Sequence, residues 1–176
     1  EAARKRAEAA ARSKADARGR ETARLESTSP PARNEKIPEV GSGPSVFSTL
    51  RGHLRLPARG EITGRFGAAR ADGGPSWKGV FIRAASGTEV RAVGPGRVVF
   101  ADWMRGFGNL LIVDHGEGYL TIYGNNESLL RQPGDAVKPG DTIATVGASG
   151  GSEFSGLYFE LRHLGRPIDP IGWLAR

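Results

Sequence analysis

The chain has 176 residues, a formal net charge of +6 at pH 7 and no cysteine. It is long enough for one ordinary domain plus an extension, and the lack of cysteine excludes disulfides and thiolate metal sites. The positive charge favours an anionic partner, but the arginines are scattered, so nucleic acid is a poor candidate. No apolar run approaches the roughly 18 residues that span a bilayer. Because the chain does not begin with methionine, we expect a fragment with any signal peptide upstream.

The first 43 residues divide into two segments of different composition. Residues 1–26 are mostly Ala, Arg, Lys and Glu, which are strong helix formers, and Leu25 is the only large aliphatic residue among them. A helix without an apolar stripe is typical of a solvent-exposed spacer or of a coiled-coil end. We interpret residues 1–26 as a coiled-coil remnant, with a disordered basic tail as the alternative. Residues 27–43, STSPPARNEKIPEVGSG, predict a flexible linker.

Residues 44–55 form a short segment with a helical pattern. Val46, Phe47 and Leu50 fall on one face at helical spacing, and a proline at its start and a glycine near its end suit the two ends of a helix. Two helical turns do not persist alone in water, so this arm needs a surface on which to bury its apolar face.

From residue 56 to the C-terminus, short apolar or alternating runs are separated by glycine-rich turns. No amphipathic helical pattern of useful length appears there. Seven runs have the length and the β-branched or aromatic content of strands: GVFIRA, EVRAV, GRVVFADWM, NLLIVDHG, YLTIYGN, TIATVG and LYFELRHL. We therefore predict a mostly β domain over residues 56–176, built from hairpins in two packed antiparallel layers.

The order of these runs from about residue 59 to 176 carries a resemblance. GEITGRFG, WKGVFIRAASGTEV, PGDAVKPGDTIATVGASGG and LYFELRHLGRPIDPIGWL together resemble the LytM (M23-type) peptidoglycan endopeptidase domain. The resemblance implies that active members hold zinc with a His and an Asp four residues apart and with the second His of a His-x-His. A further His follows the strand that here reads YLTIYG. Such ligands leave one metal position open for the water that attacks the amide.

The residues of this chain at those positions cannot assemble a zinc site. The His-x-x-x-Asp falls on WKGVF, which places Trp77 and Phe81 at the ligand positions. The His-x-His falls on GLY, which gives Gly156 and Tyr158, and the further His corresponds to Asn125. We therefore expect no bound metal, no cofactor and no peptidase activity.

The three histidines do not offer a different metal site. His53, His115 and His163 lack metal-ligand spacing such as His-x-x-x-His, and we expect each to be a turn or surface residue. No phosphate-binding glycine loop, no Gly-x-Ser-x-Gly elbow and no cysteine nucleophile occurs either.

A cleft with other properties is expected where the metal would lie. Strand alternation places Tyr158, Glu160 and Arg162 on the face that carries the metal in active relatives. Aromatic side chains with arginine in a concave site are the usual anchors of protein–protein contacts, although Phe81 and Tyr158 could simply fill the space left by zinc. The expected partner-binding residues are Trp77, Lys78, Phe81, Phe107, Tyr123, Asn125, Tyr158 and Arg162.

Within the family, the segments WKG, DWMRGFG, LYFELR and IDPIGWLAR are similar to EnvC-type murein hydrolase activators. That resemblance implies a periplasmic protein at the division site of a Gram-negative bacterium, which switches on zinc-dependent N-acetylmuramoyl-L-alanine amidases. It also implies a coiled coil that docks to a division-associated ABC-transporter-like membrane complex. A peptidoglycan-binding tether is the alternative. We expect the 44–55 arm to cover the cleft as a self-inhibitory element, with a permanent packing clamp on another face as the alternative.

Overall fold

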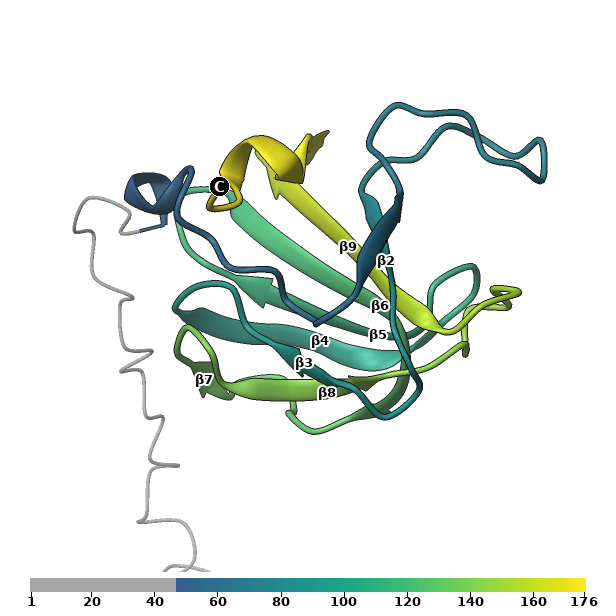
Figure 1. Cartoon of the computed structure of the whole chain (residues 1–176). Helices are drawn as coiled ribbons and strands as arrows, with labels where there is room; N and C mark the ends of the chain where they lie inside the picture. The colour runs from purple at the N-terminus through teal and green to yellow at the C-terminus, as the bar shows by residue number, and fades with distance from the viewer. Residues whose placement is uncertain (1–46) are drawn as a thin grey trace, which may run out of the picture. The chain divides into compact units, whose positions relative to one another are not determined.

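The computed structural model of the chain describes residues 47–176 (Figure 1). The expected coiled-coil remnant (1–26), the linker (27–43) and Val46 of the arm lie outside the described residues. In chain order the described elements are the 3₁₀ helix η1 (Ser48–Leu50), strands β1 (Glu61–Gly64), β2 (Val80–Arg83), β3 (Glu89–Arg91), β4 (Gly96–Met104), β5 (Gly108–Asp114), β6 (Tyr119–Leu129), β7 (Ala136–Val137), β8 (Thr142–Val146), β9 (Gly156–His163) and β10 (Arg166–Ile168), and the 3₁₀ helix η2 (Pro170–Trp173).

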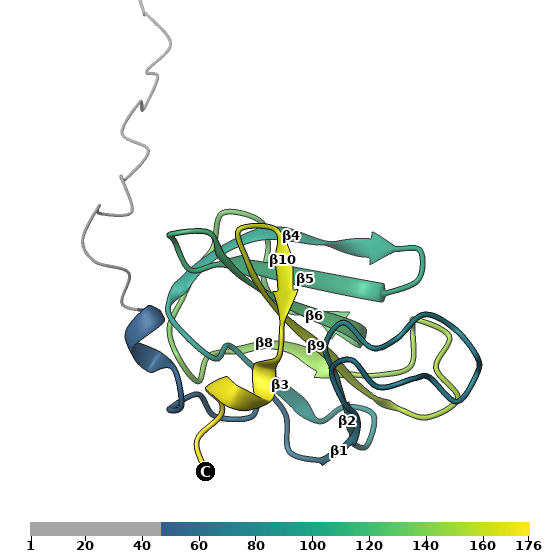
Figure 2. The same ribbon diagram turned by 90° about the horizontal axis from the view of Figure 1, so that it is seen from above.

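All strand pairings are antiparallel, and the main path through the sheet runs β1-β2-β9-β6-β5-β4-β7 (Figures 1 and 2). Strand β6 pairs with β5 and β9 and, through its last residues, with β8, which in turn pairs with β3. The prediction of a mostly β antiparallel domain is confirmed. The seven predicted runs correspond to β2, β3, β4, β5, β6, β8 and β9, whereas the short strands β1, β7 and β10 were not among them.

The hydrophobic core lies where the β3–β8 pair packs against the central strands. Val90 of β3 and Ile143 of β8 belong to one buried cluster with Ile82, Leu157 and Phe159 of β2 and β9. Because side chains alternate along a strand, the residues of β9 between these core positions lie on its opposite face. That opposite face carries the candidate site.

Phe47, the first described residue, is part of the core. Its ring is 0% exposed and stacks on His115 with ring centroids 4.1 Å apart. It also packs against Tyr119 at 5.3 Å and Trp173 at 5.4 Å, and the Tyr119 ring stacks on His163. We refer to these five residues as the N-terminal aromatic cluster.

Backbone hydrogen bonds fix the segment after Phe47 to the C-terminus. The amides of Gly52 and Leu54 both donate to the carbonyl of Trp173, at 2.9 and 3.0 Å, and the amide of Ala175 donates to the carbonyl of Leu54 at 2.8 Å. Figures 1 and 2 accordingly show η1 close to η2 at one side of the domain. A side chain on Gly94 would approach the Phe47 ring to 2.9 Å, so Gly94 provides the room for this packing.

These contacts correct two expectations. The described part of the arm does not cover the cleft: Phe47 and Leu50 are absent from the cleft lining, and Phe47 is held in the core, as the packing-clamp alternative predicts. The reason is that the stacked rings of His115 and Trp173 offer Phe47 full burial. His115 lies in the turn between β5 and β6, as expected, but it is only 7% exposed and is therefore not a surface residue. Among residues 47–176, no helix is long and apolar enough to cross a bilayer.

Candidate functional site

The domain has a cleft of about 750 Å³, and none of the five residues of the N-terminal aromatic cluster lines it. Three loops and the outward face of β9 surround it, and Figure 1 shows the long β1–β2 loop and the 147–155 loop at one end of the domain. Its lining includes Arg70, Trp77 and Lys78 of the β1–β2 loop, Phe81 and Arg83 of β2, Phe107 of the β4–β5 turn, Asn125 of β6, Phe154 of the 147–155 loop, and Tyr158, Glu160 and Arg162 of β9.

The aromatic residues at the positions of the zinc ligands contact one another. Phe81 and Tyr158 are direct partners across the β2–β9 pair. The Trp77 ring lies 5.9 Å from that of Phe81 and 6.2 Å from that of Tyr158, and Phe107 lies 5.8 Å from Tyr158. These centroid distances are typical of packed aromatic pairs. Phe81 and Tyr158 are 7% and 9% exposed, so they form the buried part of this aromatic wall, whereas Trp77 and Phe107 are half-buried.

Two glycines are required for this aromatic wall. A side chain on Gly156, at the position of the first His of the His-x-His, would come within 2.5 Å of the Phe81 ring. A side chain on Gly64 would come within 2.8 Å of the Trp77 indole. The aromatic replacements and their glycine neighbours therefore fit together as one packed unit.

Cations flank the aromatic wall. The Arg70 guanidinium lies over the Trp77 ring, 4.3 Å from its centroid, and the Arg83 guanidinium lies 4.1 Å from the ring of Phe154. Sequence analysis placed Lys78 and Arg162 beside the cleft but missed Arg70, Arg83 and Phe154. Arg70 and Phe154 lie in loops without strand alternation, so no periodic pattern marked the direction of their side chains.

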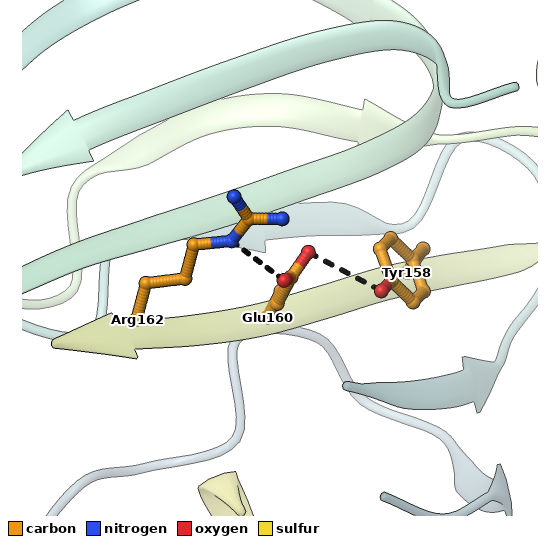
Figure 3. A network of polar contacts seen from close by, with 3 residues as sticks. All are labelled: Tyr158, Glu160 and Arg162. Carbon is orange, nitrogen blue, oxygen red and sulfur yellow. Dashed lines mark hydrogen bonds and ion pairs between the residues drawn. The ribbon is translucent and has the colours of Figure 1, made fainter. Parts of the chain in front are cut away.

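Tyr158, Glu160 and Arg162 form a polar chain along the outward face of β9 (Figure 3). The Tyr158 hydroxyl donates to Oε2 of Glu160 at 3.3 Å, and Nε of Arg162 donates to Oε1 of the same carboxylate at 2.7 Å. Burial, together with the neighbouring Glu160 carboxylate, raises the pKa of Tyr158 far above its ordinary value. The phenol therefore stays protonated and acts as a hydrogen-bond donor at neutral pH.

Asn125 lies at the cleft, but its amide is engaged within the domain. Its Nδ2 donates to the carbonyls of Gly147 and Gly156, both at 2.9 Å, and its Oδ1 accepts from the amide of Gly150 at 2.8 Å. With both amide hydrogens in use, Asn125 holds the 147–155 loop and has no donor left for a partner.

Tyr123 does not line the cleft, which corrects its place among the expected partner-binding residues. Asn125 has a positive φ of 66°, and the β5–β6 register shifts beside it. Such a bulge interrupts the alternation of side chains, so the two residues point to different faces. Tyr123 is fully buried, and its hydroxyl accepts from the Val93 amide at 3.2 Å and from the Thr121 hydroxyl at 3.1 Å.

The side chains at the cleft do not fit a zinc ion. The positions of the ligands carry indole, phenyl, phenol and amide groups, and the amide of Asn125 is already bonded to the backbone. Within residues 47–176, no group of three or more His, Cys, Asp or Glu residues could hold a metal ion.

The fold is that of an M23-type β domain, and aromatic residues line its cleft. Residues 75–170 match the model of peptidase family M23, more than half of the chain, and the chain belongs to this family. The family resemblance inferred from the strand order is thereby confirmed.

Relatives are similar to this chain over most of its length. The murein hydrolase activator EnvC of Escherichia coli is 40% identical over 97% of this chain and 42% of its own length. The murein hydrolase activator NlpD of Escherichia coli is 38% identical over 69% of this chain and 31% of its own length. The chain thus spans less than half the length of these relatives.

Solved structures support the same fold. A zinc-containing peptidase from Vibrio cholerae is 26% identical with a TM-score of 0.61, covering 70% of this chain and 40% of the other. Csd3 from Helicobacter pylori is 26% identical with a TM-score of 0.61, covering 70% of this chain and 33% of the other.

Proposed function

We propose that this chain is a non-catalytic activator that binds a peptidoglycan hydrolase through the cleft. The observation that carries the proposal is the aromatic wall at the metal-ligand positions, with cations beside it, in a domain related to proteins named murein hydrolase activators. Half-buried aromatic rings, such as Trp77 and Phe107, beside cationic groups in a preformed concavity suit a protein contact. The partner-binding residues we propose from the sequence-derived set are Trp77, Lys78, Phe81, Phe107, Tyr158 and Arg162.

The hydrolase we propose is a zinc-dependent N-acetylmuramoyl-L-alanine amidase. Binding in the cleft would favour the amidase conformation in which an inhibitory segment has left its zinc site. An activator shifts such an equilibrium only by its difference in affinity for the two states. The expected setting is the periplasm at the division site, with residues 1–26 continuing into a coiled coil that contacts an ABC-transporter-like membrane complex.

An assay of dye release from labelled peptidoglycan tests the proposal. Purified amidase should release dye faster in the presence of this chain, and the chain alone should release none. Lys78→Glu at the cleft should weaken activation, whereas Lys138→Glu, a matched charge reversal at an exposed position outside the cleft lining, should not. If Lys78→Glu and Phe107→Ala both activate like the wild-type chain, the cleft is not the activating surface.

Two further measurements separate this proposal from its alternatives. A pull-down on purified sacculi, compared with one on purified amidase, identifies a peptidoglycan tether if only the sacculi retain the chain. Elemental analysis after dialysis should find no stoichiometric zinc, and a chelator should leave the melting temperature unchanged, because no bound ion stabilises the folded state. Stoichiometric zinc would contradict the non-catalytic assignment.

A further inference from the structure

Glu160 is a buried carboxylate whose contacts are both made to neighbours on the same strand. The residue is 0% exposed, and its oxygens bind Nε of Arg162 and the hydroxyl of Tyr158 (Figure 3). A carboxylate removed from water is strongly destabilising unless it is paired, so Glu160 and Arg162 constrain each other. The side chain of Arg162 is 32% exposed, so its outer end reaches solvent in the cleft.

This contact leaves the outer part of the Arg162 guanidinium available. Glu160 binds Nε, and among residues 47–176 no acceptor binds the two terminal nitrogens of Arg162. These nitrogens carry four N–H donors in a rigid plane that matches the two oxygens of a carboxylate. Because Nε is fixed, the side chain loses less freedom when such a group binds.

Arg70 brings a second guanidinium to the same place. It stacks over Trp77, and its charge acts on Tyr158 together with that of Arg162. Its Nε is buried and has no hydrogen-bond partner among the described residues. A buried donor without an acceptor is unfavourable, and a bound anion would supply the missing acceptor.

We propose that Arg70 and Arg162 form a carboxylate-binding subsite beside Tyr158, with Glu160 as the positioning residue for Arg162. The carboxylate is that of an Asp or Glu side chain on the hydrolase, so this inference rests on the proposed function. The apolar wall of Trp77 and Phe107 next to the subsite favours a protein segment, because an apolar side chain and an acidic one can then dock together.

The charges that line the cleft agree with an acidic occupant. The lining contains four cationic and three acidic side chains, and the carboxylate of Glu160 is already paired with Arg162. A partner segment with a positive charge at the subsite would be repelled by the guanidinium groups of Arg70 and Arg162 and would bind less well than an acidic segment.

Titration calorimetry with the full chain and purified amidase measures the subsite. Arg162→Lys keeps the charge but removes the planar donors, and Arg70→Gln removes the second guanidinium; each should weaken binding about tenfold. Glu160→Gln keeps the side-chain shape but loses the charge that fixes Arg162, and should weaken binding about three- to fivefold. The double variant Glu160→Gln/Arg162→Lys should weaken binding no more than Arg162→Lys alone. Glu160 acts only by holding the Arg162 guanidinium in place, so its substitution has no further effect once that guanidinium is absent.

Strand β3 offers a matched control. Arg91 binds Glu89 at 2.6 Å with the same spacing of two residues along a strand, but both side chains are more than half exposed and lie outside the cleft. Glu89→Gln and Arg91→Lys should leave the affinity for amidase unchanged. Urea unfolding of each variant shows whether it is folded. If Glu160→Gln does not fold, the affinities of Arg70→Gln and Arg162→Lys still show whether the carboxylate-binding subsite exists.

The outcomes separate this inference from the proposed function. If the wild-type chain binds amidase and both arginine variants bind equally well, the subsite is wrong and the proposed function stands. If the effects of Glu160→Gln and Arg162→Lys simply add, Glu160 is not a positioning residue. If the wild-type chain binds no amidase but binds sacculi in an Arg162-dependent manner, the carboxylate belongs to peptidoglycan, and both the protein occupant and the proposed function are wrong.

Discussion

Two aromatic clusters of the domain have no residue in common, and they differ in how their polar groups are satisfied. In the N-terminal aromatic cluster, both ring nitrogens of His115 are bonded, to the Pro95 carbonyl at 2.6 Å and to the Thr121 hydroxyl at 2.7 Å. At the cleft, donors of Arg70 and Arg162 have no acceptor among the described residues. Similar residue types thus make a closed structural cluster in one place and, in the other, an open cleft whose donors lack acceptors among the described residues.

The difference shows that aromatic content alone does not identify a binding site. Phe47 has the helical spacing of a detachable arm, yet it is fully buried between His115 and Trp173. Trp77 and Phe107 are half-buried beside unpaired donors, which gives a partner both apolar area and polar contacts. Substitutions in the first cluster should therefore change the stability of the domain, and those in the second should change binding.

The largest effect on stability is expected for Phe47→Ala. Removing a fully buried aromatic ring leaves a cavity and should lower the free energy of unfolding by about 3–5 kcal/mol. Urea unfolding measures the change, with Leu130→Ala at an exposed position as a control that should stay within about 0.5 kcal/mol. If the free energy of unfolding falls no more than in the control, or if the affinity for amidase rises, Phe47 belongs to a displaceable arm and not to the core.

His115 should make the stability of the domain depend on pH. Burial lowers the pKa of His115 from 6.5 to about 4, although the Pro95 carbonyl and the Asp114 carboxylate oppose this shift. Between these values the unfolded chain binds the proton and the folded chain does not. The contribution is therefore complete above pH 6.5 and is lost as the pH falls towards 4, by roughly 3 kcal/mol.

Urea unfolding between pH 7 and pH 4 tests the effect of His115. The His115→Gln variant should lose less stability over this range than the wild-type chain, whereas Leu130→Ala, which changes no titratable group and lies at an exposed position, should follow the wild type. Equal slopes for wild type and His115→Gln would show that His115 does not titrate as its burial predicts.

Phe107→Ala should have its main effect on binding. A central aromatic contact in a protein interface is worth on the order of 2 kcal/mol of binding free energy or more, so affinity for amidase should fall by about thirtyfold. Calorimetric titration measures the loss, and the melting temperature should change little because the ring is half-buried. If the affinity for amidase is unchanged and the stability of the domain is lowered, Phe107 has a structural role in packing and does not contact the partner.

A smaller loss of stability than that of Phe47→Ala is expected for Asn125→Ala. It removes the donors to Gly147 and Gly156, but the Gly147 carbonyl also accepts from the Gly156 amide at 3.0 Å, so the loss should be about 1–2 kcal/mol. Asn125→Asp should lose more stability than Asn125→Ala, because it places a buried carboxylate oxygen against the carbonyl oxygens of Gly147 and Gly156. Loss of amidase binding without any change in stability would instead indicate a direct contact of Asn125 with the partner.

Much of the fold could be predicted from the sequence because strand alternation and glycine-rich turns are local signals. The same alternation correctly placed Tyr158, Glu160 and Arg162 on one outward face of β9. Alternation failed at Asn125, where one residue with a positive φ reversed the expected direction of the side chains and Tyr123 was assigned to the wrong face.

The remaining errors concern contacts between residues far apart in the chain. Phe47 meets His115 and Trp173 only in the folded domain, and no local pattern specifies that His115 is buried there. Arg70 reaches Trp77 from within a loop, where composition gives no direction for the side chain. Such residues are identified by packing and not by periodicity.

The close fit between Gly156 and Phe81 has an evolutionary consequence. Any mutational path from this cleft to a His-x-His would introduce a side chain at Gly156 within 2.5 Å of the Phe81 ring. A histidine at residue 156 therefore requires a smaller side chain at residue 81. Phe81→Asp, the ligand type that the family resemblance places there, would give that room but would leave an unpaired carboxylate among buried aromatic rings. A mutational path that places zinc ligands in this cleft thus passes through a less stable intermediate in which one carboxylate cannot yet hold a metal ion.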